Sequence, residues 1–224
     1  MVKWEILIAT LCFRAPGLGR LFDALLPQVD AVEGAVRVTA LRNLGERPLA
    51  EIRQALLDQA DAEYVCFIDD DDMVPDDYVA TVLPLLDGVD FIGWRMQVYF
   101  DGTPQKPTFH SLQHERWESG NAWYGNVSHL NPVRLELARQ ASYLTGYPED
   151  IRWSDKIAKL AKTEHYVGDD KIMYHYYTIE PGNWSPTASM WVEGSAARVS
   201  AASSCVPRPV TSSPYLAYHP DSTC

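Results

Sequence analysis

The sequence predicts an α/β protein whose doubly wound, mostly parallel central sheet has flanking helices and is followed by a smaller β region. Two observations lead to this class. Three strand-helix pairs follow one another before residue 88, and such repetition with right-handed crossovers builds a parallel sheet. The third strand, 64–68, is apolar without alternation, as expected of a central strand that is covered on both faces. A chain of 224 residues with 46% hydrophobic content can bury a substantial core in one domain.

The first half alternates regularly between strands and helices. Its helices carry apolar residues at i, i+3 and i+4 spacing. We expect a loop over 14–20, a short helix stopped by Pro27, and a helix with Pro48 at its first position. The expected elements are a strand at 3–10, a helix at 21–26, a strand at 35–41, a helix at 48–60, a strand at 64–68 and a helix at 78–86.

The pattern changes after residue 88. Asn131-Pro132 forms a good cap and first position for a helix that reaches about residue 144. Residues 103–121 are polar and carry no clear pattern. Beyond residue 180 a tail rich in Ser, Pro and Ala cannot bury a core of its own, although Tyr215, Leu216 and Tyr218 offer it a docking point. The expected elements are strands at 89–100, 122–130 and 171–179 and helices at 132–144 and 151–162.

Acidic residues concentrate in one segment of the chain. The net charge is -11, and residues 54–102 hold 12 acidic side chains with Arg95 as their one basic residue. No basic patch is available for a nucleic-acid backbone. We therefore expect no nucleic-acid partner.

Cysteine usage and the N-terminus predict a cytoplasmic protein. The cysteines Cys12, Cys66, Cys205 and Cys224 show no CxxC spacing, which favours a reducing compartment and argues against structural zinc. Glu5 lies where a signal peptide would be apolar. No apolar run approaches the roughly 18 residues that a transmembrane helix needs.

The most informative stretch is Asp69-Asp70-Asp71-Asp72, which follows the third strand directly. Ligands of open α/β sheets gather at the carboxyl ends of the strands. Four adjacent carboxylates repel one another unless a cation or solvent relieves the repulsion. The stretch therefore indicates either a site for a divalent metal or a solvated acidic turn that caps the helix after Pro75.

Three other features could contribute to a site. Glu149-Asp150 precedes a helix, where a carboxylate can act as a base or simply cap the helix. His175 lies among tyrosines and is either a metal ligand or a satisfied core residue. The first two strands end at 10–14 and at Arg42-Asn43, which offer hydroxyl, amide and guanidinium groups at the edge where the aspartates emerge.

Residues 53–72 resemble the signature of glycosyltransferase family 2, which has the GT-A fold. In that family a helix with an Arg-Asn-x-x-(Leu)-x-x-Ala pattern leads into Glu-Tyr-hydrophobic-x-Phe-hydrophobic-Asp-x-Asp-Asp. The segment 149–155 resembles the family's Glu-Asp-x-x-(Trp/Phe)-x helix start, and Tyr174-His175-Tyr176 resembles its late Tyr-x-His strand. The resemblance covers roughly residues 4–180.

The resemblance implies a single GT-A-like catalytic domain over 1–180, with a nucleotide-binding half at 1–102 and an acceptor-side half at 103–180, followed by the tail at 181–224. It implies inverting transfer of a sugar from a nucleoside diphosphate sugar, with UDP as the expected nucleotide. The acceptor would be a hydroxyl of a glycan, a lipid-linked molecule or a protein. A divalent cation, Mn²⁺ or Mg²⁺, would assist the reaction.

The resemblance also implies roles for individual residues. The nucleotide pocket would be lined by Thr10, Arg14, Asn43, Arg53, Asp69 and Asp70, with Asp69 near the ribose. The metal would be held by Asp71, Asp72 and His175, although both Asp69/Asp71 and Asp70/Asp72 fit the family's Asp-x-Asp. The catalytic pair would be Asp150, as general base, and Glu149.

Two other functions stay open at this point. A haloacid-dehalogenase-like phosphohydrolase would place Asp-x-Asp after an apolar strand and Gly-Asp-Asp later, as in 69–72 and 167–170, but Met73 replaces the usual Thr or Val and two strand-helix units precede the motif. A non-catalytic module that binds nucleotide sugars or glycans would share the fold.

Five aromatic residues either form a sugar-stacking surface for the acceptor or belong to the core. They are Trp94, Trp117, Trp123, Tyr124 and Trp153.

Overall fold

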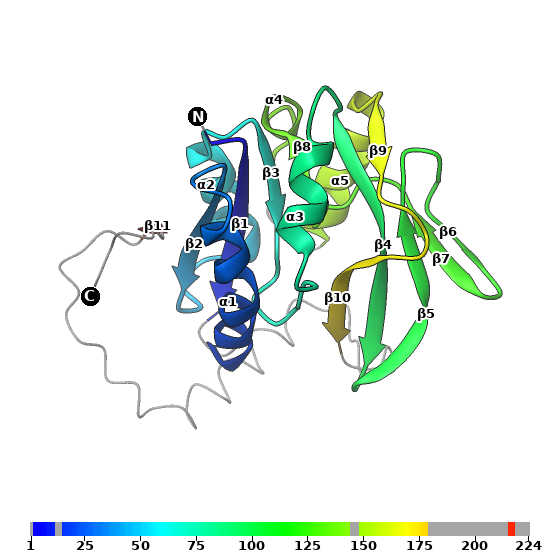
Figure 1. Cartoon of the computed structure of the whole chain (residues 1–224), viewed down its shortest axis with the longest axis horizontal. Coiled ribbons are helices and arrows are strands. Elements are labelled where there is room, and N and C mark those ends of the chain that lie inside the picture. Colours follow the sequence, from blue (N-terminus) through cyan, green and yellow to red (C-terminus); the bar gives the residue numbers. More distant parts are fainter. Residues whose placement is uncertain (1, 12–14, 144–147, 179–214, 218–224) are drawn as a thin grey trace.

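A computed structural model describes residues 2–11, 15–143, 148–178 and 215–217 of the chain. These residues form one mixed sheet with helices packed against it (Figure 1). The strands are β1 (Trp4–Leu11), β2 (Val36–Asn43), β3 (Tyr64–Phe67), β4 (Phe91–Phe100), β5 (Thr103–His110), β6 (Trp117–Ser119), β7 (Ala122–Gly125), β8 (Val133–Arg134), β9 (Glu164–Tyr166), β10 (Ile172–Thr178) and β11 (Tyr215–Ala217). The helices are α1 (Ala15–Asp30), α2 (Leu49–Gln59), α3 (Tyr78–Val82), the 3-10 helix η2 (Leu83–Leu85), α4 (Leu135–Ala138) and α5 (Glu149–Leu160).

The sheet combines a parallel part with a mixed part. Its order is β11-β2-β1-β3-β8-β4-β5-β7-β6, and β9 and β10 also pair with β4. β1 lies between β2 and β3 and runs parallel to both. β8 is antiparallel to β3 and β4, and β5 is antiparallel to β4. This arrangement confirms the predicted α/β class, with a doubly wound first part and a smaller β region after it.

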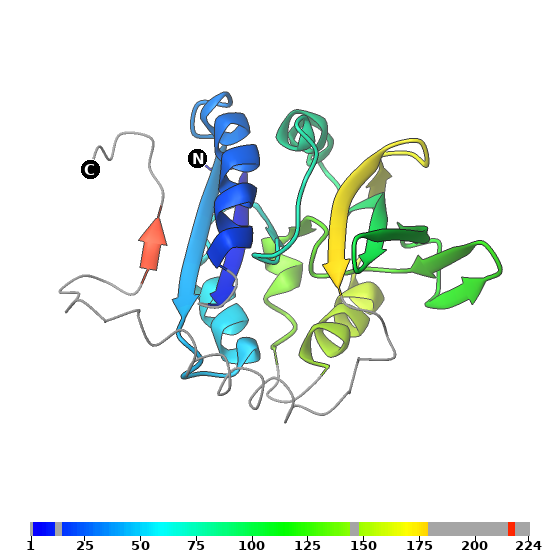
Figure 2. The same ribbon diagram turned by 90° about the horizontal axis from the view of Figure 1, so that it is seen from below.

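Both faces of the parallel part are buried. On β1, Ile6 and Ile8 face a core shared with α1 and α3, whereas Leu7 and Ala9 face a second core shared with α2 and α5. α1, the blue helix in Figure 2, runs alongside β1 and β2. Because helices cover both faces, β1 is apolar at most positions, and its buried Glu5 is paired with Arg37 and Thr39 of β2.

The first helix is longer than the sequence analysis predicts. α1 begins at Ala15, inside the expected loop at 14–20, and continues past Pro27 to Asp30. Pro16 lies in the first turn, where a backbone N–H has no partner within the helix, and Pro27 lies in the last turn, where one hydrogen bond is lost. Leu21 and Leu25 are fully buried against the sheet, and this packing stabilises the longer helix.

Three other expectations for helices need correction. Pro48 is the N-cap of α2 instead of its first residue. The helix expected at 78–86 is divided, because α3 has only five residues and the 3-10 helix η2 follows it. The predicted helix at 132–144 is wrong, because Val133–Arg134 form a strand and only Leu135–Ala138 are helical. Val133 pairs with Val65 and with Phe91, so the demand for a strand between β3 and β4 overrides the local helix signal.

The second half holds more strands than its sequence pattern indicates. The predicted strand at 122–130 ends at Gly125 as β7, because a turn at Ser128 follows it: Asn131 N donates to Ser128 O at 3.1 Å. The unpatterned region 103–121 contains β5 and β6, and β9 was not expected. In the tail, β11 pairs antiparallel with β2, while Tyr218 lies outside the described residues.

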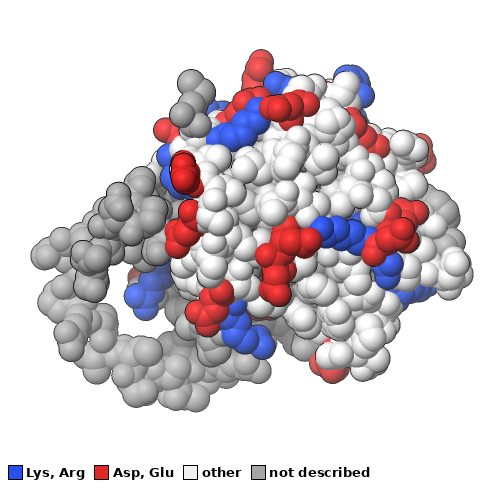
Figure 3. Space-filling view, viewed as in Figure 1, with Lys and Arg blue, Asp and Glu red and all other residues white. Residues whose placement is uncertain are grey.

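Charged side chains are scattered over the face seen in Figure 3. Basic residues lie among acidic ones there, and those of the described part of the chain do not gather into a continuous patch. No described helix is long and apolar enough to cross a membrane. Cys66 is a buried free thiol, and burial raises its pKa to about 12. The other three cysteines lie outside the described residues.

Candidate functional site

The candidate site lies at the carboxyl ends of β1, β2 and β3. Parallel pairing sets Thr10 opposite Arg42, and Leu7 opposite Phe67, so that the three strands end at one edge of the sheet. Thr10 is buried at this edge. Arg14, which was expected beside it, lies outside the described residues. The topology thus brings together the strand ends that sequence reasoning singled out.

Asn43 shapes the loop after β2. Its side-chain Nδ2 donates to the carbonyl of Arg47 at 2.8 Å, and its Oδ1 accepts from the backbone N–H of Gly45 at 3.1 Å. Gly45 has a φ of 89°, which suits glycine. Asn43 is buried, and its amide therefore contributes to the wall of the site by fixing this loop.

The four aspartates, which we call the acidic turn (Asp69–Asp72), divide into two buried and two partly exposed residues. Asp70 and Asp72 are 0% and 1% exposed, whereas Asp69 and Asp71 are half-buried. The backbone N–H of Asp72 donates to the carbonyl of Asp69 at 3.1 Å and closes the turn. Of the two registers that the sequence leaves open, Asp69/Asp71 is thus the one whose side chains reach solvent.

Asp72 fastens β10 to the acidic turn. Its Oδ2 accepts from the hydroxyl of Tyr174 at 2.8 Å, and its Oδ1 accepts from the backbone N–H of Tyr177 at 2.8 Å. The same Tyr174 hydroxyl accepts from the backbone N–H of Asp69 at 3.0 Å. Burial, aided by Asp69 and Asp71, raises the pKa of Asp72 well above its ordinary value. Each carboxylate oxygen of Asp72 thus accepts a hydrogen bond from β10.

Helix α1 approaches the acidic turn through a glycine. A Cβ at Gly17 would lie 2.7 Å from the carbonyl oxygen of Asp70 and 3.0 Å from Cα of Asp71. Only a glycine permits this approach without a shift of one backbone. Gly17 thereby helps to hold the acidic turn in place.

Arg53 joins the acidic turn to the start of α5. It is 3% exposed, and its Nη2 lies 2.8 Å from Asp69 Oδ1 while its Nη1 lies 2.8 Å from Glu149 Oε1. Burial alone would lower the pKa of Arg53, but Asp69 and the other nearby acidic groups hold it above its ordinary value. The guanidinium is therefore charged and links segments 96 residues apart in the sequence.

Glu149 and Asp150 take different positions in the first turn of α5. The Glu149 side chain is 11% exposed and paired with Arg53, whereas the Asp150 side chain is 33% exposed. Neither is the N-cap, which is Pro148. Both carboxylates nevertheless lie where the helix dipole favours negative charge. Of the two carboxylates, that of Asp150 is the more exposed.

His129 lies between the acidic turn and Asp150, and sequence reasoning did not predict it. Its Nε2 is 3.8 Å from Asp69 Oδ2, and its Nδ1 is 3.8 Å from Asp150 Oδ2. The backbone N–H of Phe67 donates to the His129 carbonyl at 2.8 Å, which holds this loop against the end of β3. No spacing in the sequence points to His129, since only the tertiary fold places it beside these carboxylates.

The backbone of His175 lies beside the acidic turn, because it exchanges two hydrogen bonds with Met73, at 3.1 and 2.9 Å. Its ring packs near Tyr99, whose hydroxyl lies 3.2 Å from His175 Nδ1, and burial lowers its pKa. For the neighbouring residues on β10, Tyr174 and Tyr176, burial and then the nearby Asp69 and Asp72 raise the pKa of the hydroxyl. Across the described residues, no three His, Cys, Asp or Glu side chains are arranged to hold a metal ion by themselves.

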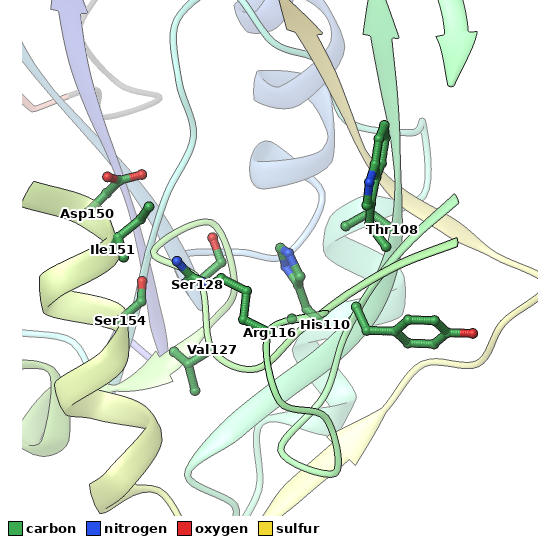
Figure 4. A pocket seen from close by; sticks show the side chains of 11 residues that line it. Thr108, His110, Arg116, Val127, Ser128, Asp150, Ile151 and Ser154 are labelled. Carbon is green, nitrogen blue, oxygen red and sulfur yellow. The ribbon is translucent and has the colours of Figure 1, made fainter. Parts of the chain in front are cut away.

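A cavity of about 490 Å³ opens beside Asp150 (Figure 4). We call it the α5 pocket. The first two turns of α5 and the loop after β7 form one wall, and β5 and β7 form another. Its lining residues are Thr108, His110, Arg116, Trp123, Tyr124, Gly125, Val127, Ser128, Asp150, Ile151 and Ser154.

The aromatic candidates for sugar stacking fall into two groups. Trp94 and Trp153 are 0% and 2% exposed and belong to the core, where Trp153 stacks on Tyr143 at 5.4 Å. Trp123 and Tyr124 are half-buried and line the α5 pocket. The side chain of Trp117 is outside the described part of the structure.

Comparison with solved structures reveals relatives in fold. The region 1–349 of TarS from S. aureus matches with a TM-score of 0.57 at 15% identity, over 79% of this chain and 60% of that one. The same region in complex with UDP-GlcNAc matches with a TM-score of 0.55 at 19% identity, over 80% and 59% of the two chains. Its complex with UDP gives 0.53 at 15% identity, over 80% and 61%. No family model and no curated protein sequence matches this chain.

At these low sequence identities the similarity shows a shared fold and nothing more. It agrees with the α/β fold expected from the sequence, and this chain spans about three fifths of the length of TarS 1–349.

Proposed function

We propose that this chain is an inverting, metal-dependent glycosyltransferase of family 2 that moves a sugar from a nucleoside diphosphate sugar, with UDP as the nucleotide, to a hydroxyl acceptor. One observation carries the proposal. Two partly exposed carboxylate sites, the acidic turn and Asp150, flank one buried network in which Arg53 pairs with Asp69 and Glu149. The fold relative TarS 1–349 in complex with UDP-GlcNAc supports the choice of donor.

The donor side is the edge formed by Thr10, the loop after β2 and the acidic turn. Asp69 would lie near the ribose of the donor, and Asp71 would hold the divalent cation. Mg²⁺ at nucleotide sites is usually held by one or two carboxylates together with substrate phosphates, so a cage of three protein ligands is not required. The half-buried Asp71 fits that mode. Mn²⁺ or Mg²⁺ bound there would stabilise the negative charge on the departing diphosphate.

The acceptor side is the α5 pocket. Asp150 accepts the proton of the acceptor hydroxyl while that oxygen bonds to the anomeric carbon and the bond from this carbon to the diphosphate oxygen breaks. A single displacement from the opposite face inverts the anomeric centre. General-base catalysis of this kind contributes about 10²- to 10⁴-fold to the rate. Glu149 acts through Arg53 as a positioning residue, because its carboxylate faces the guanidinium.

The catalytic domain would consist of two halves. Residues 1–102 supply the nucleotide-binding half of a single catalytic domain and residues 103–180 the acceptor-side half, with 181–224 as a tail. The buried ion pairs of Arg53 join the two halves, since Asp69 belongs to the first and Glu149 to the second.

Thermal unfolding with nucleotides tests the donor side. We expect UDP and UDP-sugars to raise the melting temperature of the wild type in the presence of Mn²⁺, and Asp71→Ala to abolish this effect. Asp76→Ala is the matched control, because Asp76 is an exposed acid just after the turn. If no nucleotide protects the wild type with any metal, the proposal fails.

Asp150→Asn tests the acceptor side. We expect nucleotide binding to persist while transfer falls about 10²- to 10⁴-fold. Glu51→Gln, an exposed acid in the first turn of α2, should transfer normally. Full transfer by Asp150→Asn would place the base elsewhere. Release of phosphate from simple phosphoesters through an aspartyl-phosphate at Asp69 would indicate a phosphohydrolase, and donor binding without any turnover by the wild type would indicate a binding module.

A further inference from the structure

We infer that His110 is a specificity-determining residue of the α5 pocket, whose Nε2 accepts a hydrogen bond from a second hydroxyl of the acceptor. The acceptor is then a polyhydroxylated molecule, a sugar or an alditol, and not a molecule that offers a single hydroxyl. This inference rests on the proposed function, because it gives the acceptor side of that site a substrate class.

The tautomer of His110 is fixed by a buried asparagine. Asn131 is 0% exposed, and its Nδ2 donates to the carbonyl of Ile92 at 3.0 Å. A carbonyl can only accept, so the other end of the amide, Oδ1, must face His110 Nδ1, which lies 2.8 Å away. Since Oδ1 is also an acceptor, the proton of the neutral ring lies on Nδ1. Nε2 is left with a lone pair.

The ring is exposed to the pocket because its neighbour is a glycine. His110 pairs with Gly125 across β5 and β7, so the two residues share one face of the sheet. A Cβ at position 125 would lie 3.2 Å from His110 Cδ2 and 3.6 Å from Nε2. Any larger residue would press on or cover this edge of the imidazole. Figure 4 shows the ring of His110 directed into the pocket across from α5.

His110 stays neutral at physiological pH. Burial lowers its pKa to about 4, and the hydrogen bond to Asn131 opposes this only in part. The charged or titratable groups that face it, Arg116, His129 and His114, lower the pKa further. A neutral nitrogen with a lone pair binds hydroxyl or amine donors and does not attract anions.

The pocket therefore presents two acceptors from two walls. Asp150 on α5 accepts the proton of the reacting hydroxyl, and His110 on β5 needs a second donor. An acceptor with one hydroxyl would leave one of these groups unsatisfied, which is unfavourable in a partly desolvated site. The volume of about 490 Å³ lies in the usual range for small-molecule sites. A sugar ring or an alditol supplies several hydroxyls within that space.

Two substitutions each keep one of the two ring functions. In His110→Gln the side-chain amide reaches the position of Nε2 and can accept a hydrogen bond there, but Asn131 Oδ1 loses its donor and stability should fall. His110→Asn can donate to Asn131 but has no group at Nε2. His114→Asn is the matched control, because His114 is nearby and does not line the pocket. The probes are methyl glycosides and alditols, with methanol and propanol as single-hydroxyl acceptors, and the readout is UDP release from a UDP-sugar.

We expect methyl glycosides or alditols, but not the simple alcohols, to increase UDP release by the wild type. In His110→Asn the KM for the polyhydroxylated acceptor should rise about 3- to 10-fold with little change in kcat, the loss expected for one neutral hydrogen bond. His110→Gln and His114→Asn should stay near the wild type. Hydrolysis of the donor by water and protection by UDP should be the same in all variants.

Wild-type kinetics in His110→Asn, with transfer intact, would overturn the inference and leave the proposed function standing. Equal stimulation by simple alcohols would do the same, as would preference for an amine as acceptor. Long-range ¹H–¹⁵N spectra should show the His110 proton on Nδ1, and a proton on Nε2 would also overturn it. If no UDP-sugar binds or reacts with the wild type, the proposed function itself fails.

Discussion

The acidic turn and the α5 pocket both bury polar groups, but the buried groups have different partners in the two regions. At the acidic turn, burial involves full charges: Arg53 is held between Asp69 and Glu149. In the α5 pocket, the buried partners are neutral: Asn131 fixes His110 through one hydrogen bond. Asp150 itself lines the α5 pocket, and His129 lies between that residue and Asp69 of the acidic turn.

The two regions therefore differ in what they present. At the acidic turn the buried guanidinium of Arg53 lies against Asp69, so a full positive charge is held beside this carboxylate. The α5 pocket presents the neutral ring of His110 together with the charged side chains of Asp150 and Arg116. Removing one member of the charged network leaves an uncompensated buried charge, whereas removing one member of the neutral network loses a single hydrogen bond.

The largest effect on stability should come from Arg53→Met. The substitution keeps the length of the side chain but leaves Asp69 and Glu149 without their cation, and we expect it to lower the free energy of unfolding by about 3–5 kcal/mol. Denaturant unfolding followed by tryptophan fluorescence measures this. The double variant Arg53→Met/Glu149→Gln should recover part of the loss, because it removes one of the stranded charges. A loss below about 1 kcal/mol would mean that the charges at the acidic turn are not coupled in this way.

Because His110 is neutral in the folded protein, the free energy of unfolding should depend on pH. The folded ring takes up a proton only near pH 4, whereas the unfolded ring does so near 6.5. The unfolded state therefore binds more protons in this window, and the free energy of unfolding falls as the pH drops from about 6.5 to about 4. The loss should reach up to about 3 kcal/mol. It should vanish in His110→Asn and persist in His114→Asn, and an unchanged profile in His110→Asn would show that His110 is not its source.

The smallest of these effects tests the contact between α1 and the acidic turn. Gly17→Ala would set a Cβ 2.7 Å from the Asp70 carbonyl, and we expect a loss of about 1–3 kcal/mol together with weaker binding of UDP. Gly19→Ala, two residues later in the same helix, meets nothing within 4 Å and should stabilise the protein by up to about 1 kcal/mol. Equal stability of the two variants would show that α1 does not support the turn.

Several parts of the site follow from local sequence. Thr10, Asn43 and the acidic turn lie at one sheet edge because each follows an apolar parallel strand, and the carboxyl ends of such strands coincide. Asp150 was recognisable because a pair of acids precedes a helix pattern. These signals work because hydrophobic periodicity and turn chemistry act over a few residues.

Other parts depended on contacts between distant segments. The helix signal at Asn131-Pro132 failed because β3 and β4 require a strand between them, and Asn131 itself is used to hold His110 and Ile92. His175 carried a family-like pattern, yet its ring lies near Tyr99. The strands β5 and β6 lack a clear alternation of apolar residues. They form because β5 pairs with β4 and β7, and β6 pairs with β7.

The sequence by itself determined the α/β class, the edge of the sheet that holds the site and the acidic character of that site, because these depend on the order and periodicity of residues along the chain. Only the tertiary structure decided which aspartates are exposed, that Glu149 is buried against Arg53, and that His110 and His129 face the site. The physical reason is that burial and charge pairing are properties of neighbours in space. For Arg53 and Glu149 those neighbours are 96 positions apart in the chain.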